Sequence, residues 1–293
     1  MNNTTVRSIL FVPADSERKI EKSTTSGADA VVLDLEDSVS QSRLGYARDL
    51  VADYLQNKFD RNPQKIWVRV NPLNSAFILD DLTSVIKGAP DAVLLPKCFS
   101  GQDVHVLDNY LTILERREGV SDGHIQIVPV ATETPQAMFG LDSYRNCSAR
   151  LLGLTWGAED LSSAVGASTN KDSDGRLSFT YQLARSLCLL GSKSANALAI
   201  DGIFADFRDS EGLRTEVAQS RKDGFNAKFA IHPAQIEIIN EGFLPDEAEI
   251  QHARAVVEAF ATQEGQGAVQ LDKVMLDRPH LTQAKRILAI IGE

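Results

Sequence analysis

Short apolar runs recur along this chain and most constrain what it can fold into. Each run is four to six residues long and is followed by a polar segment and a stretch with helical periodicity. Near-continuous apolar strands of this length are typical of parallel sheets that are buried on both faces. The eight runs are Ser8–Pro13, Ala30–Leu35, Ile66–Val70, Ala92–Leu95, Ile125–Val130, Leu151–Trp156, Leu198–Asp201 and Lys228–Ile231.

Eight strands that alternate with helices, at intervals of roughly 25–35 residues, predict a (β/α)8 barrel. A doubly wound open sheet is the alternative. No GxGxxG follows the first strand and no GxxxxGK[ST] occurs, which disfavours the nucleotide-binding folds built on those loops. We assign residues 1–245 to the barrel, as the catalytic domain, and residues 246–293 to a C-terminal helical extension.

The extension is expected to contain two helices, Asp246–Thr262 and Pro279–Ile291. A flexible linker, Gln263–Ala268, and an extended or turn-forming piece, Val269–Asp277, lie between them. A tail beyond a closed barrel must pack on something. It either covers its own barrel or crosses to a neighbouring subunit.

Composition excludes several classes of function. The net charge is −10, from 30 basic and 40 acidic residues, whereas general nucleic-acid binding requires a basic surface. The three cysteines form no CxxC motif and no disulfide framework, so a reducing cytoplasm is expected. We see no signal peptide, and no apolar run approaches the ~20 residues of a membrane span.

Polar residues follow the predicted strands, at the end where a barrel of this type carries its active site. Asp34 is about as easily a buried salt-bridge partner as a site residue, and His232 before Pro233 is better read as a turn histidine. Arg69 ends a very apolar strand and needs a carboxylate from the protein or from a substrate. The full set is Asp34, Glu36, Asp37, Arg69, Asn71, Lys97, Glu133, Asp160, Asp201 and His232.

Glu133 and Asp160 stand out in this set. They follow the fifth and sixth strands, with about one helix worth of chain between those strands. Such a unit makes the strands parallel and brings both carboxylates to one edge of the sheet. Two close carboxylates resist joint ionisation, and a hard cation such as Mg²⁺ relieves the conflict. The hypothesis is a Mg²⁺ site; the alternative is that both residues are helix N-caps.

Nine segments, in order, resemble the citrate lyase β-subunit-like proteins of the HpcH/HpaI aldolase superfamily, which includes the malyl-CoA and citramalyl-CoA lyases. The resemblance implies a (β/α)8 barrel, Mg²⁺, often a homotrimer, and a substrate carried as a CoA or acyl-carrier thioester. The segments are RSILFVPADSERKIEKS, DLEDSV, WVRVNP, LLPK, ATETP, GLTWGAEDL, AIDGIFADFRDSEGL, KFAIHPAQI and VMLDRPH.

The resemblance also implies residue roles. Glu133 and Asp160 match the family's Mg²⁺ ligands, and Arg69 matches the arginine that holds the substrate's carboxylate. Asp277 matches an aspartate that the family's lyases bring from a neighbouring subunit; an ordinary turn residue is the alternative. The remaining matches are cations for the CoA phosphates, for which a solvated helix face is the alternative. These cations are Arg18, Lys19 and Lys22.

One departure from the superfamily pattern bears on the reaction. The pyruvate-dependent aldolases carry a Glu-His pair after the second strand, where this chain has Glu36 and Asp37. The departure argues against a pyruvate aldolase and for the thioester lyases. We therefore count Asp37 among the catalytic candidates, with Asp277 and Arg69.

The expected activity is retro-Claisen cleavage of citramalyl-CoA or malyl-CoA, which releases acetyl-CoA and pyruvate or glyoxylate. The enzyme alternatives are a citrate lyase β-subunit acting on a citryl acyl-carrier thioester, with an acyl-carrier partner, and a malyl-CoA thioesterase. From a different class, an idle barrel that serves as a scaffold subunit is the alternative, and the set of Arg69, Glu133, Asp160 and Asp277 argues against it.

Overall fold

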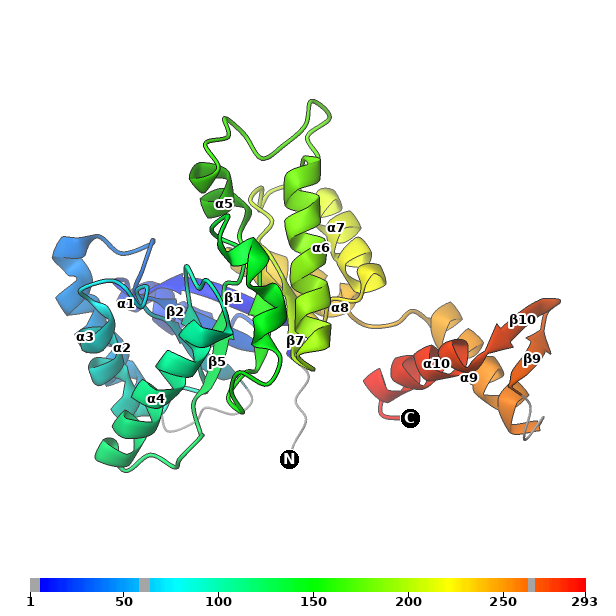
Figure 1. Cartoon of the computed structure of the whole chain (residues 1–293), viewed down its shortest axis with the longest axis horizontal. Helices are drawn as coiled ribbons and strands as arrows, with labels where there is room; N and C mark the ends of the chain where they lie inside the picture. Colours follow the sequence, from blue (N-terminus) through cyan, green and yellow to red (C-terminus); the bar gives the residue numbers. More distant parts are fainter. Residues whose placement is uncertain (1–5, 58–63, 263–266) are drawn as a thin grey trace. The chain divides into compact units, whose positions relative to one another are not determined.

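The computed structural model describes residues 6–57, 64–262 and 267–293 (Figure 1). The chain divides into two compact units, Met1–Asn240 and Glu241–Glu293. The sequence placed this division between residues 245 and 246. The catalytic role of the first unit and the packing of the second on a neighbouring subunit stay predictions.

The first unit is an eight-stranded parallel sheet with the strand order β5-β4-β3-β2-β1-β8-β7-β6. Parallel bridges from Ile127 to Leu151 and from Val130 to Thr155 join β5 to the β6 segment, so the sheet is a nearly closed barrel. The predicted barrel is confirmed. Its strands are β1 Ser8–Pro13, β2 Ala30–Asp34, β3 Lys65–Arg69, β4 Ala92–Leu95, β5 Gln126–Pro129, β6 Gly153–Thr155, β7 Leu198–Asp201 and β8 Ala227–Ala230.

Side chains of alternate strand residues fill the barrel interior. Ile9 of β1, Val32 of β2, Trp67 of β3 and Phe229 of β8 belong to one buried cluster inside the sheet. Successive side chains on a strand point to opposite faces, so every second residue joins this cluster and the others face the surrounding helices. The same alternation determines which charged residues at the strand ends point into the barrel and which point toward the helices.

Helices cover the outside of the strands, as α2, α4, α6 and α7 show in Figure 1. No helix in the described ranges combines the length and apolar content needed to cross a bilayer. Apart from the connection between β5 and β6, the helices that begin in the first unit are α1 Glu17–Ser23, η1 Gln41–Arg43, α2 Leu44–Asn57, α3 Ile78–Val85, η2 Ile86–Gly88, α4 Gly101–Glu118, α5 Ala158–Ala164, α6 Phe179–Ser194, α7 Ser210–Asp223, η5 Pro233–Gln235 and α8 Ile236–Gly242.

The connection from β5 to β6 differs from the sequence prediction. Instead of an α-helix it contains two short 3₁₀ turns, η3 Ala137–Phe139 and η4 Leu141–Tyr144. Gly140 separates them and packs so closely that an added Cβ would lie 2.4 Å from the carbonyl oxygen of Phe99. The connection therefore lies tightly against the start of α4.

The second unit has its own small core. Helices α9 Glu247–Thr262 and α10 Arg278–Ile290 pack with the antiparallel hairpin β9 Ala268–Leu271 and β10 Val274–Asp277. The hairpin agrees with the extended or turn-forming piece expected over Val269–Asp277. Of the predicted linker, residues 263–266 lie outside the described residues. The core side chains are Ala253, Val256, Val269, Leu276, Ala284 and Leu288.

Candidate active site

Arg69 and Asp34 form an ion pair at the mouth of the barrel, by which we mean the C-terminal ends of its strands. The two residues are register partners on β3 and β2 and both point to the interior, in phase with Trp67 and Val32. Nε and Nη2 of Arg69 lie 2.7 Å from Oδ1 and Oδ2 of Asp34. This geometry is a two-pronged guanidinium–carboxylate bond, so the arginine is held rigidly.

Each partner of this pair favours the ionised form of the other. Burial opposes ionisation of Asp34, but the hydrogen bonds and charge of Arg69 hold the pKa of that carboxyl below its ordinary value. The guanidinium of Arg69 also lies over the ring of Phe11, with its carbon 5.0 Å from the centroid. Of the arginine's nitrogens, Nη1 is the one left to face the other acids at the mouth, Glu36 and Asp37, at 3.0 and 3.4 Å.

Lys97 connects the acids that surround this pair. It follows β4 and Pro96, and its ammonium nitrogen contacts Glu36 and lies 3.7 Å from Asp37 and 3.5 Å from Asp160. Its backbone N–H donates a hydrogen bond to Oε2 of Glu133. One residue therefore contacts carboxylates from the loops after β2, β5 and β6.

Glu133 is a buried carboxyl group, with only 4% of its surface exposed. Its pKa is raised to about 8, chiefly by burial; the carboxylates of Asp160 and Glu36 act in the same direction, while the N–H of Lys97 opposes the shift. Asp160 is therefore close enough to repel Glu133, as the strand-end argument predicted. A buried carboxyl with too little positive charge around it favours a bound cation.

The loops after β5 and β6 are held against each other. The backbone N–H of Ala131 donates to the carbonyl of Thr155 at 2.8 Å, and that of Gly157 donates to Oγ1 of Thr132 at 3.2 Å. An added Cβ on Gly157 would lie 3.0 Å from Cγ of Glu133. Glycine at this position lets the second loop approach the buried carboxyl.

The N-cap alternative for the two carboxylates does not hold. Gly157 is the N-cap of α5, and Asp160 lies in the first turn of that helix. Glu133 precedes η3 by several residues and caps no helix. Neither side chain is therefore committed to capping a helix.

The donor set fits Mg²⁺. Within the described part of the chain, no three His, Cys, Asp or Glu side chains converge on one point. Mg²⁺ is commonly held by one or two carboxylates, with water and substrate oxygens completing its coordination shell. Glu133 and Asp160 provide such a pair, and the raised pKa of Glu133 is the physical sign that this buried carboxyl is not fully neutralised by its neighbours.

The family model for HpcH/HpaI aldolase/citrate lyase matches residues 7–233 of this chain. The chain belongs to this family. The β subunit of citrate lyase from Haemophilus influenzae is 33% identical over 284 residues, which cover 96% of this chain and 95% of that protein. A (3S)-malyl-CoA thioesterase from Cereibacter sphaeroides is 32% identical over 286 residues, covering 97% and 93%.

A solved structure of a relative bears on the fold. The protein CitE from Mycobacterium tuberculosis, in complex with magnesium, acetoacetate and coenzyme A, superposes with a TM-score of 0.81 and 28% identity, covering 99% of this chain and 100% of that one. A further structure of that protein, with magnesium and pyruvate, has a TM-score of 0.73 and 26% identity over 98% and 99%. The suspected family membership is thus confirmed.

Within this family member, the barrel brings together a subset of the predicted polar residues. We call this subset the mouth cluster. It holds every barrel candidate for catalysis and metal binding. Its members are Asp34, Glu36, Asp37, Arg69, Lys97, Glu133 and Asp160.

Other predicted polar residues serve the framework. Asn71 donates to Asp81 at 2.8 Å and to the carbonyl of Leu35 at 3.1 Å, which fixes the loop after β3. His232 is the N-cap of η5, and its Nδ1 accepts from the N–H of Ala234 at 3.2 Å, as expected of a turn histidine. Asp201 points outward from the barrel, where it pairs with Arg185 and Lys228.

The remaining candidates lie outside the mouth cluster. Arg18, Lys19 and Lys22 are exposed on α1, which begins just after the C-terminal end of β1. Asp277 belongs to the second unit, where it is the N-cap of α10 and its Oδ1 lies 2.6 Å from Nδ1 of His280. The roles that the family resemblance implies for these four residues stay predictions.

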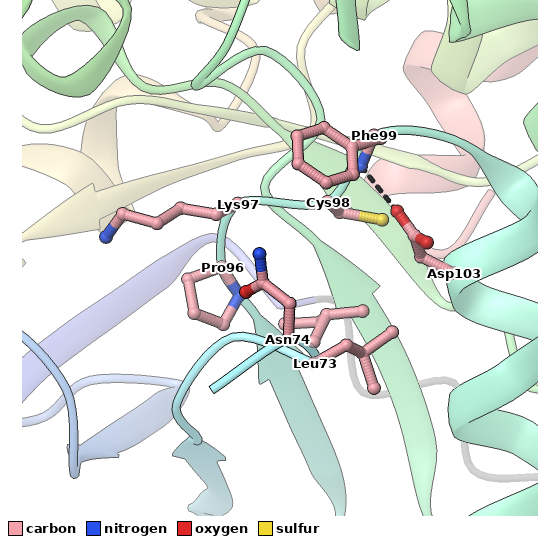
Figure 2. A pocket seen from close by; sticks show the side chains of 8 residues that line it. Leu73, Asn74, Pro96, Lys97, Cys98, Phe99 and Asp103 are labelled. Carbon is pink, nitrogen blue, oxygen red and sulfur yellow. Dashed lines mark hydrogen bonds between the residues drawn. The ribbon is translucent and has the colours of Figure 1, made fainter. Parts of the chain in front are cut away.

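A small, open pocket lies beside the mouth cluster. Figure 2 shows its walls, including Asn74, Cys98 and Phe99; the side chain of Lys97 points away from Cys98 and Phe99. The thiol of Cys98 is buried, and burial raises its pKa to about 12, so it is a packing residue and no nucleophile. The pocket lining is Leu73, Asn74, Leu95, Pro96, Lys97, Cys98, Phe99 and Asp103.

Three contributors to the site escaped the sequence argument. Phe11 supports Arg69, Thr132 ties two loops together, and Gly157 makes space for Glu133. Phe11 has a usable signal, because it stands two residues after the inward-facing Ile9 and so shares its side of the strand. Thr132 and Gly157 carry no comparable signal, since their roles depend on the contact between two loops.

Proposed function

We propose that this chain is a Mg²⁺-dependent carbon–carbon lyase that cleaves citramalyl-CoA or malyl-CoA to acetyl-CoA and a 2-oxo acid. The observation that carries the proposal is the buried, under-neutralised carboxyl of Glu133 beside Asp160, with one arm of Arg69 directed at the same cluster. CitE structures that contain magnesium, with pyruvate in one and acetoacetate and coenzyme A in another, support it.

Glu133 and Asp160 would hold the metal in this proposal. Bound Mg²⁺ supplies a Lewis acid for the carboxylate and hydroxyl oxygens of the substrate. Arg69 is already fixed by Asp34, so its Nη1 provides a preorganised donor to the substrate carboxylate. Asp37 is the candidate acceptor of the hydroxyl proton, because its side chain is 54% exposed at the mouth.

Cleavage breaks the carbon–carbon bond next to the hydroxyl-bearing carbon. That carbon becomes the ketone of pyruvate or the aldehyde of glyoxylate, and the other carbon becomes the α-carbon of an acetyl-CoA enolate. The enolate needs a proton at that carbon from a placed acid. We assign this step to Asp277 of a neighbouring subunit in a homotrimer, following the family resemblance.

The CoA part of the substrate requires cations. Arg18, Lys19 and Lys22 are exposed on the short helix that follows β1, at the rim of the mouth. Phosphate groups are bound by such clusters through charge and hydrogen bonds. We propose that these residues bind the CoA phosphates.

A malyl-CoA thioesterase is the second candidate, favoured by relatives of that name at 32–33% identity over nearly the whole chain. It would use the same metal site, with water attacking the thioester carbonyl. A citrate lyase β-subunit, with an acyl-carrier partner, is supported by relatives at 31–33% identity. The three activities differ in their products and in the carrier of the substrate.

The deciding experiment is an assay of purified protein with Mg²⁺ against citramalyl-CoA and malyl-CoA. A 2-oxo acid with acetyl-CoA establishes the lyase, whereas free CoA thiol without oxo acid establishes the thioesterase. Turnover of neither, in a protein that binds Mg²⁺, contradicts both and favours an acyl-carrier-bound substrate.

Asp277→Asn tests the proton-transfer role. It should retain Mg²⁺ binding and lose turnover by about a hundredfold or more, the usual contribution of a positioned acid. Asp272→Asn, in the exposed turn of the same hairpin, is the matched control and should leave turnover unchanged. Full activity in Asp277→Asn would remove Asp277 from the mechanism.

A further inference from the structure

Lys97 is held in an uncommon backbone conformation. Its φ is +51°, in the left-handed region that non-glycine residues usually avoid. In this conformation its N–H donates to Oε2 of the buried Glu133. The backbone of one residue thus aims one of the two proposed metal ligands.

The side chain of the same residue contacts the second proposed ligand. Its ammonium nitrogen lies 3.5 Å from Oδ1 of Asp160, while it also contacts Glu36 and lies 3.7 Å from Asp37. Figure 2 shows this side chain extended away from the pocket walls Cys98 and Phe99. The ammonium group of Lys97 therefore serves three acids, Glu36, Asp37 and Asp160, instead of forming an ion pair with one of them.

The charge balance of the mouth cluster depends on this residue. The cluster contains five carboxyl groups and two cations, Arg69 and Lys97. Arg69 is committed to Asp34 through two short hydrogen bonds and faces Glu36 and Asp37 with its remaining arm. Among the ion pairs of the cluster, the one to Asp160 comes from Lys97.

We propose that Lys97 is the resident counter-ion of the metal site, a positioning residue whose ammonium group holds Asp160 in the metal-free protein and yields that carboxylate to Mg²⁺. On metal binding the ammonium group stays with Glu36 and Asp37, and the backbone N–H continues to aim Glu133. The inference rests on the proposed function, because it takes Glu133 and Asp160 as the Mg²⁺ ligands.

If Mg²⁺ replaces the ammonium group of Lys97 at Asp160, removing that ammonium group should change the Mg²⁺ affinity in a predictable direction. A lysine that merely orients the ligands would help Mg²⁺ to bind, so its loss would weaken binding. A lysine that occupies the place of the metal competes with it, so loss of its charge should tighten binding. Lys97 and Asp160 are each about one-third exposed, so solvent screens their pairing and the expected gain is on the order of tenfold.

The test is calorimetric titration of the metal-free, full-length protein with MgCl₂ alone. Lys97→Met keeps the length of the side chain and removes its charge, and should bind Mg²⁺ on the order of tenfold more tightly at low salt. Lys97→Arg keeps the charge and should bind within about twofold of the wild type. Lys87→Met removes one charge from the exposed end of α3 and η2 and is the matched control.

A second readout protects the test against a variant that is merely misfolded. Thermal unfolding without metal should show Lys97→Met below the wild type, because Asp160 and Glu36 lose their counter-ion, and saturating Mg²⁺ should close the gap. High salt should also shrink the affinity difference between Lys97→Met and the wild type, since the effect is electrostatic.

The outcomes separate this inference from the proposed function. If a folded Lys97→Met binds Mg²⁺ as tightly as the wild type or more weakly, Lys97 is not the counter-ion. The proposed metal site still stands in that case, provided that the wild type binds Mg²⁺ and Glu133→Gln does not. A wild type that binds no Mg²⁺ overturns the proposed metal site itself, and with it the exchange.

Discussion

Two pairs of neighbouring strands in this barrel carry ion pairs that face opposite ways. Asp34 of β2 and Arg69 of β3 are register partners whose side chains point into the barrel mouth. Asp201 of β7 and Lys228 of β8 are also register partners, but each stands next to an inward-facing residue and therefore points outward. The outward pair packs between the sheet and its helices.

The outward pair belongs to a network that is saturated. Oδ1 of Asp201 accepts from Nε1 of Trp156 at 2.6 Å, and Oδ2 accepts from Nη2 of Arg185 at 2.9 Å. Lys228 lies 2.7 Å from Glu216 and donates to the carbonyl of Gly202 at 2.7 Å. Burial opposes ionisation of Asp201, yet the charges of Lys228 and Arg185 hold the pKa of its carboxyl well below the usual range.

Two buried acids of the mouth cluster, Glu133 and Glu36, have pKa values that are shifted in the opposite direction. Burial raises the pKa of Glu133 to about 8, and burial likewise raises the pKa of Glu36 despite the cations beside it. A buried charge that is fully partnered is tolerated by the fold, whereas a buried charge with too few partners destabilises it and is typical of a functional site. The sign of the pKa shift therefore distinguishes Glu133 and Glu36 from Asp201, although all three are buried; Asp34, which is paired with Arg69, keeps a lowered pKa within the mouth cluster.

Asp201→Asn should have the largest effect on stability. It leaves Arg185 and Lys228 with one carboxylate fewer in a buried layer, and breaking such a pair typically costs about 3–5 kcal/mol. Urea unfolding at neutral pH measures the loss. Asp122→Asn, in an exposed pair with Arg116, is the control and should unfold as the wild type does. An equally stable Asp201→Asn would show that the network is not a framework element.

Glu133→Gln should have the opposite effect on the fold and a large effect on metal. Removing an under-neutralised buried carboxylate should leave stability in metal-free buffer at pH 8 unchanged or higher. Mg²⁺ affinity should fall about a hundredfold or more, because the carboxylate is a proposed ligand. Glu159→Gln, on the same helix turn as Asp160, removes a carboxylate that pairs with Asn170 and should bind Mg²⁺ normally.

The two regions should also respond to pH with opposite signs. Glu133 ionises near 4.5 when unfolded and near 8 when folded, so the folded state holds an extra proton between these values and loses stability as pH rises through them. Asp201 has a lowered pKa, so its contribution is present at neutral pH and is lost only as pH falls into the acid range.

The pH dependence of Mg²⁺ binding measures the titration of Glu133 directly. Below pH 8 the metal must displace the proton of Glu133, so affinity should rise about tenfold per pH unit toward pH 8 and then level off. Calorimetry at several pH values, in buffers of different ionisation enthalpy, counts the released proton. An affinity independent of pH between 6 and 8 would contradict the raised pKa.

Gly157→Ala is the smallest perturbation and tests how closely the two loops must approach. The new Cβ would lie 3.0 Å from Cγ of Glu133, so the carboxyl must move by a few tenths of an ångström. We expect Mg²⁺ affinity to fall by about threefold, within the range of modest packing changes. Gly45→Ala, with open space at the same atom, is the control. Identical metal binding in both variants would show that the approach is not critical.

The strand-end argument correctly brought Glu133 and Asp160 together, because parallel strands place their C-terminal ends on one side of a sheet. It could not separate Asp201 from the site, although the alternation of side chains along β7 contains that information. The helix expected between β5 and β6 was wrong, since Gly140 lies against the backbone of Phe99 and the connection forms two 3₁₀ turns.

By itself, the sequence determined the barrel, the positions of its strands and the acids at their ends, because hydrophobic periodicity and strand polarity are local properties. Only the tertiary structure decided how the charges are partitioned. Arg69 is bound by Asp34, Lys97 adopts a left-handed backbone that aims Glu133, and Gly157 makes room for that carboxyl. These features depend on contacts between loops far apart in the chain, and the pKa of each acid follows from its neighbours.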